Sequence, residues 1–191
     1  MSKKDLMLDI ETLGTTKSAT VIQIGACYFD RYSSEIFEKF STNIDLQTSL
    51  EKGFTVDAST IQFWMKQGDA ARKSIFEGEA MHVFDAINEF NKFASQAKQI
   101  WSHATFDFVI IMNHFEVLNI KPTFHYRAAR DIRTLVDLAD LKFTEKDSRN
   151  GIYHNALDDC IYQVQYCVRC FNELTNRKQN SSKGITIIKE R

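Results

Sequence analysis

The sequence predicts a single α/β domain in which a mixed central β-sheet is flanked by α-helices. Its length of 191 residues fits one ordinary domain. Apolar residues make up 43% and charged residues 26%, which is typical of a globular chain and excludes a disordered or fibrous one. The apolar residues first follow the two-residue period of strands and then the period of helices with short strands between them.

Three strands are expected first, over residues 5–11, 20–29 and 35–43. Short connections between them predict an antiparallel meander. In the first strand, alternation separates two faces. One face carries Leu6, Leu8 and Ile10, and the other carries Met7, Asp9 and Glu11. Because this strand is largely apolar, we expect it to lie at the centre of the sheet.

The helical period begins at Asp57, which is expected to cap a helix whose apolar stripe is Ile61, Trp64 and Met65. A short helix is expected after Gly68. Residues 80–97 are expected to form a longer helix. Its stripe comprises Ala80, Phe84, Ile87, Phe90 and Ala94.

The second half alternates a short strand, residues 99–102, with helices. A very apolar helix is expected over residues 105–118, a helix capped by Asp131 runs through Leu141, and the last helix covers residues 156–174. The domain is therefore assigned to residues 1–174. The basic tail, residues 175–191, is expected to be a flexible linker around Asn180-Ser181-Ser182 or, at Ile185–Ile188, an edge strand.

Charge and cysteine content narrow the function classes. The net charge of −1 excludes a uniformly basic nucleic-acid-binding surface, so any such contact must be local. Neither a membrane span nor a signal peptide is expected, which favours a cytoplasmic location. The spacing Cys167-x-x-Cys170 lacks a second pair, so the four cysteines are interpreted as small buried apolar residues.

Acidic residues carry the chemical signal. Asp9 and Glu11 lie side by side on one face of a predicted central strand, where burying two charges needs a basic partner or a divalent cation. Asp107 follows a strand at the start of an apolar helix, where a structural role beside the helix dipole is equally consistent. Before the last helix, Asn155 is a natural N-cap and Asp158 serves that cap, which leaves Asp159 as the better ligand candidate.

His154 precedes that cap on a loop. Most lone histidines are ordinary surface or core residues, but near a water bound to a metal ion this one becomes a candidate general base. Arg127, Arg130 and Arg133 cluster before the Asp131 helix and are either a solvated face or contacts to phosphate.

These motifs together resemble a known family. D-I-E-T-L-G near the start, F-D in mid-chain and H-N-A-L-D-D near the end are similar to the DEDDh exonucleases, the DnaQ-like group of the ribonuclease H-like superfamily. The segments T-I-Q-F-W and R-D-I-R-T-L-V-D-L resemble the small phage and bacterial 3′–5′ exonucleases of the DexA type. The resemblance covers roughly residues 5–174 and implies a ribonuclease H-like fold.

The resemblance implies a metal-dependent 3′–5′ exonuclease that acts on the 3′ ends of single-stranded RNA or DNA. Two cations, Mg²⁺ or Mn²⁺, would be held by Asp9, Glu11, Asp107 and Asp159, with Asp9 as the bridging ligand, and His154 would be the general base. The residues implied to meet the terminal nucleotide are Thr12, Leu13, Gly14 and Phe106. For Leu13 and Phe106, and for Trp64, ordinary core packing is the alternative.

One departure is His103, where many members have asparagine four residues before the mid-chain aspartate. It affects the expected detail of substrate contacts, not the four acids. A catalytically silent nucleic-acid-binding module of the same fold and a nucleotide phosphohydrolase using the same acids are the alternatives. Relatives often dimerise, so a homodimer is also an expectation, and the sequence does not separate RNA from DNA.

Overall fold

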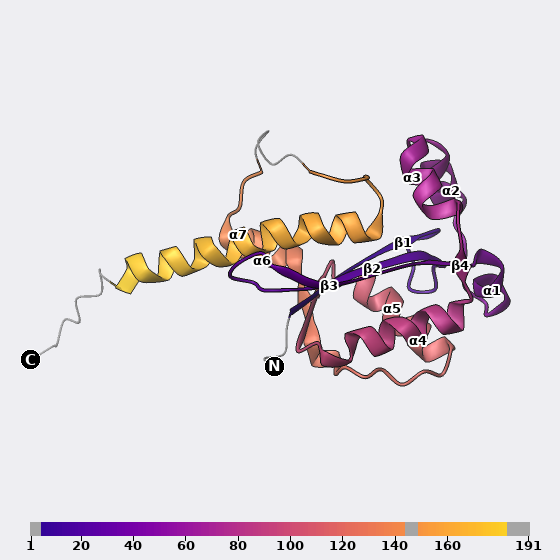
Figure 1. The fold of residues 1–191 in the computed structure, drawn as a ribbon, viewed down its shortest axis with the longest axis horizontal. Helices are drawn as coiled ribbons and strands as arrows, with labels where there is room; N and C mark the ends of the chain where they lie inside the picture. Colours follow the sequence, from indigo (N-terminus) through magenta and orange to yellow (C-terminus); the bar gives the residue numbers. More distant parts are fainter. Residues whose placement is uncertain (1–4, 144–148, 183–191) are drawn as a thin grey trace, which may run out of the picture.

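The computed structural model describes residues 5–143 and 149–182. Its centre is a six-stranded mixed sheet in the order β4-β3-β2-β1-β5-β6 (Figure 1). The strands are β1 (Asp5–Thr12), β2 (Val21–Phe29), β3 (Ile36–Ile44), β4 (Ala80–Met81), β5 (Gln99–Ser102) and β6 (Ala129–Asp131). Strands β1, β2 and β3 form the expected antiparallel meander, and β5 pairs parallel with β1.

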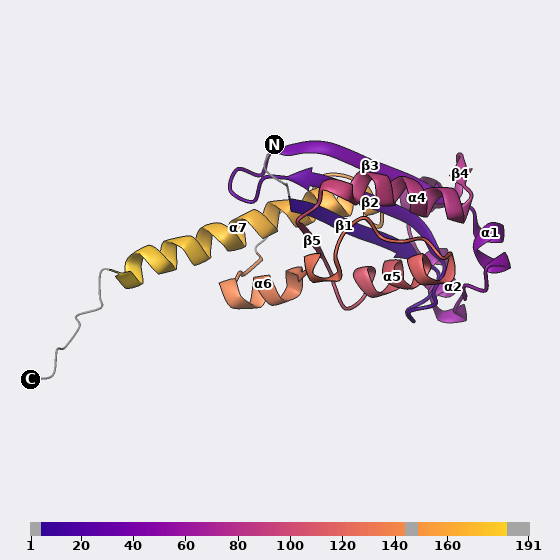
Figure 2. The same ribbon diagram turned by 90° about the horizontal axis from the view of Figure 1, so that it is seen from below.

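The helices are α1 (Leu46–Glu51), α2 (Ala58–Met65), α3 (Asp69–Phe76), α4 (Val83–Phe93), α5 (Asp107–Val117), α6 (Ile132–Ala139) and α7 (Ala156–Ser182), with 3₁₀ turns η1 (Ala94–Gln96) and η2 (Tyr126–Ala128). Helix α7 lies on one face of the sheet, and α4 and α5 lie on the other (Figures 1 and 2). Helices α2 and α3 lie beyond the end of β1. The α/β prediction and the mixed sheet are therefore confirmed.

Two apolar cores, one on each face of the sheet, follow from the alternation in β1. Leu6, Leu8 and Ile10 pack with α4 and α5, whereas Met7 packs with α6 and α7. Since β1 pairs on both sides, it is an interior strand, as expected. All four cysteines are buried and free, which confirms their interpretation as apolar core residues.

Some predicted helix boundaries and faces are wrong. Helix α4 begins at Val83 because the His82 side chain accepts the Phe84 N–H, so Ala80 lies in β4 and the exposed Phe84 is not on the buried stripe. In α2 only Trp64 is buried, whereas Ile61 and Met65 are exposed, because this helix packs through Trp64 onto the end of β1.

The tail also differs from its prediction. Helix α7 continues past residue 174 to Ser182, so Asn180-Ser181-Ser182 is helical and not a flexible linker. The Arg177 guanidinium explains the extension, because it donates to the carbonyls of Leu138 and Ala139 at the end of α6. The predicted edge strand Ile185–Ile188 lies outside the described residues. Among the described residues, no helix is long and apolar enough to span a membrane.

Candidate metal centre and active site

Asp9 and Glu11 lie near the carboxyl end of β1, on the face that α7 covers. Their side chains share this face because alternate residues of a strand point the same way. Asp9 is 6% exposed and Glu11 is 9% exposed. The Gln163 side chain of α7 donates to Asp9 Oδ1 at 2.6 Å. The two buried carboxylates therefore lie side by side, and one amide hydrogen bond joins Asp9 of the strand to α7.

Asp107 joins them from the neighbouring strand. It is the first residue of α5, which follows β5, and β5 runs parallel to β1. The Asp107 side chain is almost fully buried, and its Oδ2 accepts the backbone N–H of His103 at 2.7 Å. Ligand atoms of Asp9, His103 and Asp107 lie within 4.8 Å of one another. The mid-chain aspartate thus reaches the pair on β1.

Helix α7 brings the last acid. Gly25 of β2 lies opposite Asp9, and a Cβ at Gly25 would lie 2.2 Å from the Ala156 carbonyl carbon. Because glycine leaves this space empty, the first turn of α7 can lie directly on the sheet. Gln23 then accepts the Ala156 N–H at 2.7 Å. This contact places Asp159 beside Glu11.

The two neighbouring aspartates of α7 have different surroundings. Asn155 Oδ1 accepts the Asp158 N–H at 3.1 Å, as expected of an N-cap, and Asp158 Oδ2 accepts the Ile152 N–H at 2.7 Å. Asp158 is thus turned toward the preceding loop. Ligand atoms of Glu11, His154 and Asp159 lie within 4.8 Å of one another. The geometry therefore favours Asp159 as the ligand.

His154 has a left-handed backbone, with φ of 60°. Its ring meets Phe63 edge-on at 5.1 Å between centroids and Trp64 at 5.9 Å. Burial, and then the Arg149 charge, lower the pKa of His154 below its ordinary value. A neutral imidazole held between two aromatic rings at the edge of the acidic cluster can accept a proton there.

The carboxylates have strongly raised pKa values. Burial raises the pKa of Asp9 from 3.8 to about 7, against the opposing effects of Gln163 and Arg149. Burial and the neighbouring Asp9 and Asp107 raise the pKa of Glu11 from 4.5 to about 9. Burial and then Asp9 likewise raise the pKa of Asp107. These groups repel one another, so their charged forms need additional positive charge.

A divalent cation fits this site. The four acids offer only carboxylate oxygens, which hard cations such as Mg²⁺ and Mn²⁺ prefer. The raised pKa values of Asp9, Glu11 and Asp107 show that the protein's own cations do not neutralise these three acids fully. The structure thus brings together all five residues that sequence reasoning selected as ligands and base. Their individual roles stay predictions.

Sequence reasoning missed three residues of this site. The Arg149 guanidinium pairs with Asp159 and lies over the Tyr153 ring at 4.4 Å. Arg149 comes from a loop without periodicity, so its sequence position gave no signal. Gln163 follows Asp159 by four residues, and that spacing on a helix could have indicated a shared face. Gly25 could have been found only once its pairing with β1 was known.

The residues expected to meet a terminal nucleotide have structural partners. Leu13 is 4% exposed and packs in a small core with Trp64, whose Nε1 donates to the Thr12 carbonyl at 2.9 Å. The Thr12 hydroxyl donates to the Gly14 carbonyl at 2.7 Å, and a Cβ at Gly14 would lie 3.0 Å from an Asp57 oxygen. Phe106 is half-buried just before α5. Core packing of Trp64 is therefore confirmed, and nucleotide contacts of the others stay predictions.

Comparison with protein families gives one match over most of the chain. The family described as the 3′-5′ exoribonuclease Rv2179c-like domain matches residues 4–171. A curated relative, the exodeoxyribonuclease of Enterobacteria phage T4, is 26% identical over 204 aligned positions that cover 86% of this chain and 89% of the relative.

Solved structures share the fold at low sequence identity. E. coli exonuclease I in complex with a dA16 oligonucleotide is 13% identical with a TM-score of 0.62, and the match covers 91% of this chain and 43% of that one. The nuclease domain of 3′hExo, described as a DEDDh family member bound to rAMP, is 12% identical with a TM-score of 0.56, covering 90% and 93%. This chain thus spans less than half the length of the exonuclease I chain.

Proposed function

We propose that this chain shortens single-stranded nucleic acid from the 3′ end. The premise is that it belongs to the Rv2179c-like 3′–5′ exoribonuclease domain family and is a 3′–5′ exonuclease. The membership confirms the predicted family and its ribonuclease H-like fold. One observation carries the proposal: four carboxylates and a histidine converge from β1, α5 and the start of α7, and three of these acids, Asp9, Glu11 and Asp107, have raised pKa values. The product would be a nucleoside 5′-monophosphate.

The family implies dependence on divalent cations. We propose that these are two Mg²⁺ or Mn²⁺ ions, which Asp9, Glu11, Asp107 and Asp159 would hold. When bound, such a pair supplies a more acidic water and neutralises charge on the scissile phosphate and its leaving oxygen. Asp107 would keep its orientation through the His103 N–H, and Asp9 through the Gln163 amide.

His154 would act as the general base. Its ring accepts a proton from the water that attacks the last phosphodiester, and the P–O3′ bond breaks as the P–O bond to water forms. The lowered pKa of His154 favours the neutral form that this step needs. Phe63 and Trp64 contact the ring edge-on. The leaving 3′ oxygen takes a proton from solvent, so the shortened strand ends in a 3′-hydroxyl group.

The terminal nucleotide would lie against Thr12, Leu13, Gly14 and Phe106, on the side where β1 ends. Phe106 lies just before α5 and packs against the core that contains Ile10, and its exposed part would be available for base stacking. The name of the matched family refers to cleavage of RNA, and the name of the T4 relative refers to cleavage of DNA. Both sugars therefore belong in the test.

The test uses 5′-labelled single-stranded RNA and DNA oligomers with Mn²⁺ or Mg²⁺, and an EDTA control. We expect a ladder that shrinks from the 3′ end and that disappears with EDTA and in Asp159→Asn. Asp158→Asn is the matched control, because it changes the adjacent aspartate of the same helix turn, and it should retain the ladder. Intact oligomers beside hydrolysed free nucleotides would favour the nucleotide phosphohydrolase. Binding without cleavage would favour the silent module.

Three further expectations stay predictions. A homodimer would be seen as twice the chain mass in sedimentation of the purified protein. A cytoplasmic location would be seen by fractionation of the source cells. The domain boundary at residue 174 is likewise a prediction, and truncation after that residue tests whether residues 1–174 remain active.

A further inference from the structure

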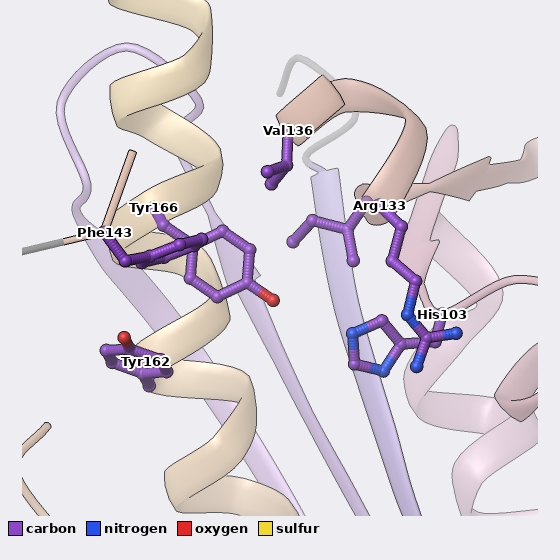
Figure 3. Close-up of a pocket in the computed structure, with 7 residues that line it drawn as sticks. His103, Arg133, Val136, Phe143, Tyr162 and Tyr166 are labelled. Carbon is purple, nitrogen blue, oxygen red and sulfur yellow. The ribbon is translucent and has the colours of Figure 1, made fainter. Parts of the chain in front are cut away.

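A cavity adjoins the acidic cluster. It has a volume of about 360 Å³ and lies between α6 and α7 (Figure 3). This volume falls within the range of small-ligand pockets, roughly 300–1,000 Å³. His103 lines it and also lies beside the metal cluster, with its Nδ1 3.8 Å from Asp107 Oδ2. The cavity and the acidic cluster are therefore neighbouring parts of one surface.

Aromatic rings form one wall of this cavity. Phe143 meets Tyr166 edge-on, with ring centroids 5.4 Å apart at 84°, and Tyr162 meets Tyr166 at 5.5 Å and 72°. Phe143 is 50% exposed. Arg133 and His103 lie on the opposite side, and the Tyr166 hydroxyl points toward them (Figure 3). The cavity therefore combines aromatic rings, on which a base can stack, with a cation that can face a phosphate.

The course of α7 fixes where this cavity lies relative to the cluster. Asp159 lies beside Glu11, Gln163 binds Asp9, and Tyr166 packs in the core that contains Met7. The helix thus runs back along β1 from the acids toward the start of the strand. Thr12–Gly14 continue from β1 in the other direction. The cavity and the segment proposed to hold the terminal nucleotide therefore flank the acids at opposite ends.

We propose that this cavity binds the base of the penultimate nucleotide, the one whose 3′ oxygen leaves. The inference rests on the proposed function, because it takes the scissile phosphate to lie over the acids. With the terminal nucleotide on the Thr12–Gly14 side, the next nucleotide would lie on the opposite side, where the cavity adjoins the acids through His103. Its base stacks on the aromatic wall, and Arg133 faces the phosphate on its 5′ side.

Phe143→Ala tests the proposal, because a half-exposed ring can be removed without opening the core. Phe84→Ala is the matched control: Phe84 is similarly exposed, on α4 at the other face of the sheet. Three substrates are compared for each protein: an intact oligomer, the same oligomer with an abasic penultimate residue, and the p-nitrophenyl ester of thymidine 5′-monophosphate. The ester has a scissile phosphate and a terminal nucleotide but no penultimate base.

The wild type should lose roughly tenfold or more in kcat/KM when the penultimate base is removed. Phe143→Ala should lose a similar factor on the intact oligomer, show little further loss on the abasic one, and cleave the ester like the wild type. Phe84→Ala should match the wild type on all three substrates. This pattern would distinguish a base contact from a general structural defect, which would lower all three rates.

Two results would overturn the inference. One is equal cleavage of intact and abasic oligomers by the wild type. The other is a Phe143→Ala protein that cleaves the intact oligomer normally, or that loses the same factor on the ester. If the wild type cleaves neither oligomer nor ester with either metal, the proposed function itself fails, and this inference fails with it.

Discussion

The acidic residues at the two ends of β1 differ in how many hydrogen-bond and ion-pair partners they have. At the start of the strand, Asp5 Oδ2 accepts the Arg31 Nε at 2.6 Å, a second guanidinium nitrogen binds Oδ1, and the Trp101 indole donates to Oδ1 at 3.2 Å. Near the other end, Asp9 accepts one amide N–H, from Gln163. The nearby Arg149 guanidinium pairs with Asp159 instead of with Asp9 or Glu11. Their pKa values rise accordingly.

This contrast separates a structural carboxylate from functional ones within a single strand. Arg31 also lies over the Phe171 ring at 4.8 Å, so Asp5 belongs to a network that holds the sheet to α7. The cluster at Asp9 instead stores unfavourable repulsion, which a bound divalent cation would relieve. Neutralising an acid should therefore destabilise the fold at one end and not at the other.

The largest effect is expected for Asp9→Asn. Losing a proposed metal ligand should lower turnover by roughly 10⁴-fold or more, since metal ions stabilise the transition state by several kcal/mol. Without divalent cations the variant should unfold at the same urea concentration as the wild type or a higher one, because one repelling charge is gone. Oligomer cleavage and urea denaturation in EDTA measure the two effects. Unfolding at a much lower urea concentration would mean that Asp9, like Asp5, stabilises the fold.

His154→Ala should slow cleavage by roughly 10²–10⁴-fold, because it removes the proposed general base and leaves all four acids. Binding of Mn²⁺, followed by calorimetry, should be retained. The sharpest control is Phe76→Ala, which removes a half-exposed ring that contacts Trp64 and leaves the histidine in place. An unchanged rate in His154→Ala would remove this residue from the mechanism.

Asp5→Asn should cost roughly 2–3 kcal/mol of unfolding free energy, somewhat less than the 3–5 kcal/mol of a fully buried pair because Arg31 remains partly exposed. The activity of the folded fraction should stay within a few-fold of the wild type. Urea denaturation beside an oligomer assay checks both points. A stable but inactive Asp5→Asn protein would mean that the two ends of β1 are not functionally separate.

Asp158→Ala should cost only about 1 kcal/mol, because it removes one link between the start of α7 and the preceding loop. Cleavage should fall modestly, since the same loop carries His154. Thermal unfolding and steady-state rates of this variant provide the measurement. Complete inactivity at unchanged stability would show that Asp158, and not Asp159, is the ligand.

Local signals in the sequence predicted much of this fold. Alternation placed the strands of the meander, and the caps at Asp131 and Asn155 mark the starts of α6 and α7. The three acidic motifs could be joined because the family resemblance supplied their order. Each of these signals depends on neighbours within a few residues of the chain.

The remaining features depend on contacts between distant segments. Arg177 of the helical tail binds a carbonyl at the end of α6, and no local pattern in the sequence indicates this contact. Ile61 and Met65 follow a helical stripe, yet α2 has only Trp64 facing the sheet. Arg149 enters the site from a loop, and Gly25 matters only because α7 lies on it. Such features appear only when the elements are packed together.

Mn²⁺ binding coupled to proton release tests the central claim most directly. The raised pKa values of Asp9, about 7, and Glu11, about 9, mean that the folded protein keeps protons that the unfolded chain loses above pH 4–5. Without cations, its stability should fall as pH rises from about 4 toward 9. Calorimetry at pH 7 in buffers of different ionisation enthalpy should show protons released on binding. Binding without proton release, or no binding, would contradict the claim that these acids hold protons until a divalent cation binds.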